Sequence, residues 1–281
     1  MHLNSLYVLA YVATVSLYLA AATSLWRELG TPRPERPVRN LAGTWLAVPA
    51  LILHGGLLAA TMFVGAALHF GFAHALSATL WLAALAVWFE SFLLPLGGLL
   101  VLVLVLAALA APLPALFGGA VILDGGDTLA LRLHVTAAIL AYSLLTIAAL
   151  HALLMAAIER ALHRGGVVDG VTSRLLARIP PLLALETLLF RLISAGFVLL
   201  TVTVLTGAVF SEELFGRPVR FDDKTDLALV SWVVFAALVV GRYGFGWRGR
   251  TALRWTLAGF ATLLLAYVGS RFVQEVILKR Y

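Results

Sequence analysis

Apolar runs long enough to cross a bilayer follow one another through almost the whole chain. About eighteen apolar residues span a hydrocarbon core of roughly 30 Å, and 62% of the 281 residues are hydrophobic while only 12% are charged. About a quarter of the residues of a soluble domain are charged. Backbone groups in lipid must be paired within the protein, and these runs do not alternate with a period of two. The sequence therefore predicts an all-α, polytopic membrane protein.

Eight transmembrane helices account for the apolar runs. The stretch 27–39 ends the first helix because it contains three prolines and four arginines. The stretch 41–111 is too long for two spans and is interrupted at 69–74 and 92–98, and a Gly- and Pro-rich segment follows at 112–128. We expect one domain over residues 1–281. Its helices are predicted at residues 3–25, 41–64, 74–92, 95–111, 129–157, 186–210, 227–241 and 255–275.

The arginines predict the orientation of the bundle. The loops 27–39, 158–185 and 242–254 hold four arginines each and follow the first, fifth and seventh helices, so all three lie on one side. The positive-inside rule makes that side cytoplasmic. Both termini are then expected on the outer, periplasmic side of a bacterial inner membrane. The net charge of +6 is explained by orientation in the lipid bilayer, and no nucleic acid is expected as a partner.

The absence of cysteine limits the chemistry. It excludes structural disulfides, thiol nucleophiles, Cys-ligated metals and covalent c-type haem attachment by this chain. Any chemistry must rest on His, Trp, Tyr, Arg and carboxylate side chains.

Two histidines inside predicted spans are the first functional candidates, since an ionisable group in lipid is costly without a partner or cofactor. His54 lies about thirteen residues into a helix that starts inside, and His134 about six residues into one that starts outside. Both then lie on the order of 10 Å from the outer surface. They could be axial ligands of the iron of a b-type haem. The alternative is that each imidazole bonds a backbone carbonyl or a Ser or Thr in the bundle.

Arginines accompany these histidines at the same level. Arg132 precedes His134 by two residues, and Arg271 lies near the outer end of the last helix. Both could meet haem propionates, because Arg binds carboxylates in a bidentate fashion. The alternatives are contact with lipid headgroups and, for Arg271, an ion pair with Glu275.

The remaining polar residues of the spans and the outer loop have structural explanations. We expect an ion pair with another helix, or a position at the membrane boundary, to explain Glu186 and Arg191, and we expect His151 to be structural. The outer loop that contains His69 and His74 carries two phenylalanines between them and could contact the edge of a cofactor. It is interpreted instead as part of the aromatic belt at the membrane interface.

Three segments resemble the CcsA/CcmC-type cytochrome c assembly superfamily, and most closely its short eight-helix branch of YpjD- or HemX-like proteins. The first runs from His54 through HFGFAHALSATLW (69–81). The second is LRLHVTAAILAYSLLTIAAL (131–150), which resembles the family's outer-face histidine and its H-V-x-x-A-x-x-x-A-Y setting. The third is residues 205–242, which is similar to the segment holding the tryptophan-rich motif WGxxWxWDPKE.

The third segment departs from that motif. A glycine, one aspartate and the lysine remain, while all three tryptophans are replaced. In the family these tryptophans form an outer platform that presents haem to apocytochrome. The resemblance implies that Phe215, Phe221 and Asp222 contribute to such a platform here.

The histidine pattern of the family is also incomplete. The resemblance implies two pairs, and here His54 matches a member of the pair inside the membrane and His134 a member of the outer pair, while the expected partners fall at Val240 and near Arg271. Either one haem is bridged by His54 and His134, or a weakened site keeps a single ligand.

The resemblance implies a protein that holds or passes haem b near the outer face, with apocytochrome c or other cytochrome c maturation proteins as partners. Loss of the tryptophans argues against a complete haem–cytochrome ligase, so enzyme activity as a cytochrome c haem lyase is the second alternative. The first is a haem-free scaffold or regulatory membrane protein of the same fold.

Overall fold

The computed structural model describes residues 5–30, 42–64, 67–117, 121–123, 129–163, 182–215, 223–273 and 277. Helices make up most of this part of the chain. Seven of them are long and apolar enough to cross a membrane, which confirms a polytopic helical membrane protein. The helices are α1 (Ser5–Gly30), α2 (Ala42–Met62), α3 (Phe72–Glu90), α4 (Gly97–Ala110), α5 (Leu113–Leu116), α6 (Leu129–His163), α8 (Leu182–Phe215), α9 (Asp223–Phe245), α10 (Gly249–Leu264) and α11 (Ser270–Phe272).

The last predicted span is helical but changes its winding. α10 is 16 residues long and leads directly into the π-helical turn η2 (Leu265–Gly269), which leads into α11. The wider π turn explains why α10 alone falls short of a full span. Within the described residues, each of the eight predicted spans is therefore represented by a helical segment.

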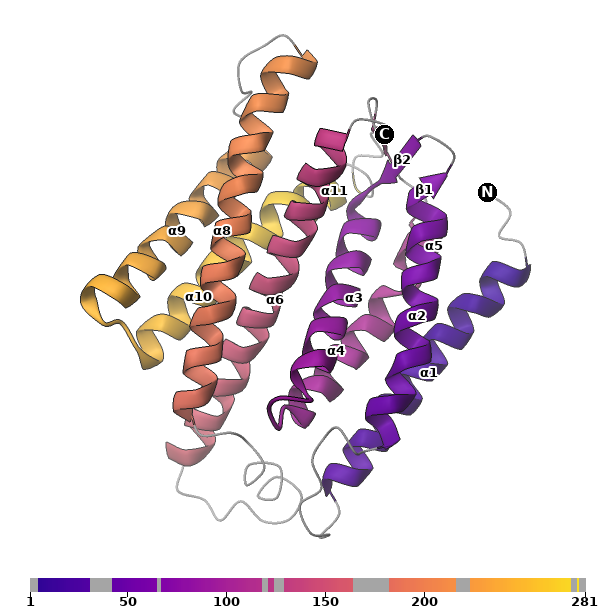
Figure 1. Ribbon diagram of the computed structural model, residues 1–281, viewed down its shortest axis with the longest axis horizontal. Coiled ribbons are helices and arrows are strands. Elements are labelled where there is room, and N and C mark those ends of the chain that lie inside the picture. The colour runs from indigo at the N-terminus through magenta and orange to yellow at the C-terminus, as the bar shows by residue number, and fades with distance from the viewer. Residues whose placement is uncertain are drawn as a thin grey trace.

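The helices form two groups (Figure 1). In the first group α1 packs on α2 and α4, and α3 packs on α2 and α4; in the second α6 packs on α8 and α10, and α9 packs on α8 and α10. The groups meet chiefly where α3 lies against α6. Large apolar side chains face outward, as expected for lipid contact. Examples are Leu6, Ile52, Leu93, Leu109, Leu183 and Leu205.

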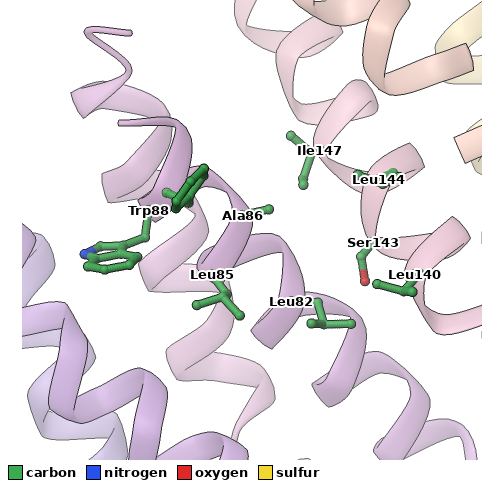
Figure 2. Close-up of a pocket in the computed structure, with 9 residues that line it drawn as sticks. Leu82, Leu85, Ala86, Trp88, Leu140, Ser143, Leu144 and Ile147 are labelled. Atoms are coloured by element: carbon green, nitrogen blue, oxygen red, sulfur yellow. The ribbon is translucent and has the colours of Figure 1, made fainter. Parts of the chain in front are cut away.

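An apolar groove of about 410 Å³ lies between α3 and α6. Figure 2 shows Leu82, Leu85 and Ala86 of α3 facing side chains of α6 across this space. Its lining has two side chains with a polar group, Trp88, whose indole N–H donates to the Thr44 carbonyl, and Ser143, whose hydroxyl donates to the Ile139 carbonyl of its own helix (2.7 Å). The groove therefore offers an apolar surface and no unpaired hydroxyl.

Tryptophan indoles tie neighbouring helices together. The Trp81 Nε1–H of α3 donates to the Leu51 carbonyl of α2, and the Trp88 Nε1–H donates to the Thr44 carbonyl, both at 2.8 Å. The two donors are seven residues apart on α3, and the two acceptors are seven residues apart on α2 in the opposite direction. The two bonds therefore hold α2 and α3 in one antiparallel register.

A small antiparallel sheet joins two connections at one end of the bundle. Its strands are β1 (Phe63–Val64), β2 (Ala67–Phe70) and β3 (Val121–Leu123), in the order β1-β2-β3, and His69 pairs with Ile122. The sequence analysis predicted no strand here: β1 lies at the end of the predicted helix 41–64, and β2 and β3 lie in predicted connections. We call this end of the bundle the sheet end; α3 and α6 begin there (Figure 1).

Candidate functional site at the sheet end

His54 is fully buried and joins three helices. On α2, its Nδ1 lies 3.1 Å from the hydroxyl of Tyr18 on α1, and its Nε2 lies 2.9 Å from the hydroxyl of Ser77 on α3. A neutral imidazole has one N–H and one lone pair. Each hydroxyl can donate or accept, so both nitrogens are satisfied. To ligate iron, His54 would first have to give up one of these hydrogen bonds.

His134 has a different environment on α6. Its Nδ1 lies 2.7 Å from the Thr206 hydroxyl oxygen on α8. That hydroxyl is within 2.7 Å of the Val202 carbonyl, to which it donates, so its oxygen accepts the Nδ1–H of His134. The lone pair of His134 is therefore on Nε2. A hydrogen bond from the other ring nitrogen is what usually fixes the tautomer and orientation of a metal-binding imidazole.

The structure does not pair these two histidines. His54 faces Tyr18 and Ser77 in the first helix group, whereas His134 faces α8 in the second. On α6, Val135 instead faces the first group, where it packs on the cluster around Phe70. No hydrogen bond or ring contact between His54 and His134 is recorded within the described residues.

The predicted propionate partners are placed as follows. Arg132 is exposed on the first turn of α6, and a separation of two residues places it about 200° around the helix from His134. Arg271 belongs to α11, but its side chain lies outside the described part of the structure. The same holds for the side chain of Phe215 at the end of α8, and Phe221 and Asp222 lie outside the described residues.

His74 is the residue that the sequence analysis misjudged. It is only 4% exposed, so it is not part of an interfacial belt, and neither ring nitrogen has a hydrogen-bond partner within the described residues. The Nδ1 of His69 on β2 is likewise buried without a partner. The sequence signal was the H-x-x-x-x-H spacing, but the burial depends on the unpredicted sheet and on the helices around α3.

The opposite end of the bundle has a structural ion pair. Arg242 of α9 bonds Glu186 of α8 at 2.9 Å, and its guanidinium lies 4.3 Å from the centroid of the Phe190 ring. The expectation of an ion pair at Glu186 is therefore confirmed, with Arg242 as the partner. His151 is fully buried, and its Nδ1 lies 3.0 Å from the Ile147 carbonyl.

Comparison with known proteins gives the family. The family model described as "Cytochrome C assembly protein" matches residues 42–278. The inner membrane protein YpjD of Escherichia coli is 37% identical over 144 residues, which is 51% of this chain and 52% of YpjD.

Shorter matches link the chain to cytochrome c biogenesis proteins. CcsA of Prochlorococcus marinus is 38% identical over 89 residues, covering 32% of this chain and 28% of that protein. CcsA of Gloeobacter violaceus is 35% identical over 91 residues, covering 32% and 27%. The aligned part of the chain thus spans about half the length of YpjD and little more than a quarter of each CcsA protein.

Proposed function

The chain belongs to the cytochrome c assembly protein family, and we propose that it is a haem-handling protein that holds or passes haem b near the outer face of a bacterial inner membrane. The match to an inner membrane protein supports that location, and the matches to cytochrome c biogenesis proteins support apocytochrome c or another maturation protein as a partner. The family model matches residues 42–278, which include helices of both groups, and we propose that one domain extends over residues 1–281.

The hydrogen bond between His134 and Thr206 carries the proposal. It fixes the imidazole with its lone pair on Nε2, which is the form that can ligate iron. Bound haem would supply an iron that accepts an imidazole nitrogen and two carboxylates that accept hydrogen bonds. In this proposal His134 ligates the iron, and Thr206 is a positioning residue that holds the ring.

The other proposed contributors follow from the sequence. Arg132 and Arg271 pair with the propionates, while Phe215, Phe221 and Asp222 belong to the outer platform. His54 is the second proposed ligand. Because both of its nitrogens are bonded, its ligation would require Tyr18 or Ser77 to release the ring.

The same observation at His54 favours a second candidate function. A fully satisfied imidazole that ties three helices together is what a haem-free scaffold or regulatory protein of this fold would keep. A haem lyase is a further alternative, and it would produce covalent holocytochrome when co-expressed with a CXXCH apocytochrome.

Absorption spectra of the purified protein test the main proposal. We expect sharp α and β bands for the dithionite-reduced wild type, and their loss in His134→Ala. Thr206→Val keeps the shape of the side chain but removes the acceptor, so haem affinity should fall about 10- to 100-fold. His151→Leu, which changes a buried histidine far from the sheet end, should leave the spectrum unchanged.

One result would reject the haem function, and another would reject His134 as the ligand. One is a wild-type protein without a Soret band even when haem is supplied during expression. The other is a His134→Ala spectrum identical to wild type, which would remove His134 from the site and leave His54 to be tested by His54→Ala.

A further inference from the structure

His74 has the largest unmet hydrogen-bonding capacity of the described side chains. Both of its ring nitrogens are buried and without a partner, whereas His151 has one bonded nitrogen and His54 has two. Leaving a buried polar group unpaired opposes folding, and native proteins seldom tolerate it without a functional reason. An unpaired imidazole at the sheet end therefore points to a group that is supplied from outside the chain.

His69 adds a second imidazole to the same place. It lies on β2, five residues before His74, and its Nδ1 is buried and unpartnered. Gly71, whose backbone is extended, connects β2 directly to α3, so both residues lie at the same end of α3.

The first turn of α3 determines which ligand charge is favoured beside His69 and His74. Gly71 is the N-cap residue, and no side chain caps the helix there. The N–H groups of a first helical turn have no acceptor within the helix, and their dipoles give this end a partial positive charge. A metal cation is disfavoured beside that charge, and an anion that only accepts hydrogen bonds is favoured. A carboxylate fits both the N–H groups and the imidazoles.

Aromatic rings form an apolar wall beside the same turn. The Phe72 ring lies 5.2 Å from the Phe117 ring and 5.4 Å from the Phe272 ring, measured between centroids. The second contact brings α11 against the first turn of α3. A ligand that combines an apolar body with a carboxylate suits this combination of surfaces.

We propose that His69, His74 and the uncapped first turn of α3 form a carboxylate-binding site that takes a haem propionate. This inference rests on the proposed haem function for its ligand, but the shared chemistry is a carboxylate, and a free carboxylic acid is the alternative source. The imidazole N–H groups donate to the propionate, and the Phe rings contact the macrocycle edge.

The test compares haem with its dimethyl ester, which has no carboxylate. Both compounds are titrated into the wild type, His74→Leu and the control His151→Leu in detergent, and binding is followed at the Soret band. We expect the wild type and His151→Leu to bind haem about tenfold more tightly than the ester, because charge-assisted hydrogen bonds are lost with the ester. His74→Leu should bind the ester as the wild type does and keep only part of the preference for haem, because Arg132 and Arg271 still pair with the propionates.

Several results would overturn the inference. A tenfold preference for haem that persists in His74→Leu would remove His74 from the carboxylate site. If His74→Leu bound both compounds more weakly and its haem complex had changed α and β bands, His74 would be an iron ligand instead. Equal affinity of the wild type for haem and ester would reject the carboxylate site while the haem function stands.

If the wild type binds neither compound, the proposed haem function fails and the site is judged with sodium propionate alone. Propionate should raise the unfolding temperature of the wild type but not of His74→Leu, and the absence of that difference overturns the inference. His74→Leu is expected to fold, because it replaces an unpaired buried imidazole with an apolar side chain. Its unfolding temperature without ligand should equal or exceed that of the wild type.

Discussion

At the scale of single residues, the histidines of this chain differ in how their nitrogens are used. His54 bonds two hydroxyls, His134 bonds the Thr206 hydroxyl that sets its tautomer, and His74 has no hydrogen-bond partner within the described residues. The sequence could single out His54 and His134 by their position in apolar spans. It could not show how the ring nitrogens of the three are bonded, because hydrogen-bond partners such as Tyr18 and Ser77 are separated from His54 by 36 and 23 residues.

The hydrogen bonds of His54 predict a stability effect. Tyr18→Phe or Ser77→Ala would leave one buried nitrogen of His54 unpaired, so each should lower the free energy of unfolding by about 1–3 kcal/mol. Denaturation in detergent measures it. Ser143→Ala is the control, because that hydroxyl bonds only its own helix. If both variants were as stable as Ser143→Ala, the Tyr18–His54–Ser77 chain would not hold the helices together.

At the scale of helices, the close approach of α2 to α1 depends on Gly43. A Cβ added to Gly43 of α2 would lie 2.7 Å from both the Ala21 carbonyl oxygen and the Leu25 backbone nitrogen of α1. Backbone atoms cannot move aside as a flexible side chain can. The two helices would have to separate.

Gly43→Ala should therefore destabilise the protein by about 1–3 kcal/mol. Gly56→Ala lies on the same helix and would meet no atom within 4 Å, so it should be neutral or stabilising by up to about 1 kcal/mol through helix propensity. Thermal unfolding of the two variants side by side compares them, and equal stabilities would mean that α1 and α2 do not cross this closely.

The predicted spans agree with the observed helices because hydropathy over about twenty residues is a strong signal. The elements that were missed are short. β1 and β3 have two and three residues, and the pairing of β3 with β2 is a tertiary contact between segments more than fifty residues apart. The π turn η2 was missed as well, since its five residues are as apolar as the helix around them. The burial of His74 follows from these same missed features.

At the scale of the whole molecule, the two helix groups meet along a seam that is incompletely filled. The groove between α3 and α6 is lined almost entirely by apolar side chains, and no side-chain hydrogen bond between these two helices is recorded within the described residues. Contact across the seam therefore depends on apolar packing.

Filling the groove should strengthen the seam. Ala86 lines it, so Ala86→Leu adds contacts there and should stabilise the protein by about 0.5–1 kcal/mol. Ala83 of the same helix is fully buried in the core, and Ala83→Leu should instead cost about 1–3 kcal/mol through overpacking. Unfolding in detergent measures both. A loss in Ala86→Leu as large as in Ala83→Leu would show that α3 and α6 are closely packed.

The two indole bonds between α2 and α3 also govern how the molecule can move. Two fixed points seven residues apart prevent sliding and rotation between a pair of rods, so α2 and α3 should behave as one rigid plate. A functional motion is then expected between α3 and α6, where sliding or rotation breaks no side-chain hydrogen bond among the described residues. Such a displacement would move His54 and His74 together, relative to His134, and so change the spacing between the imidazoles at the sheet end.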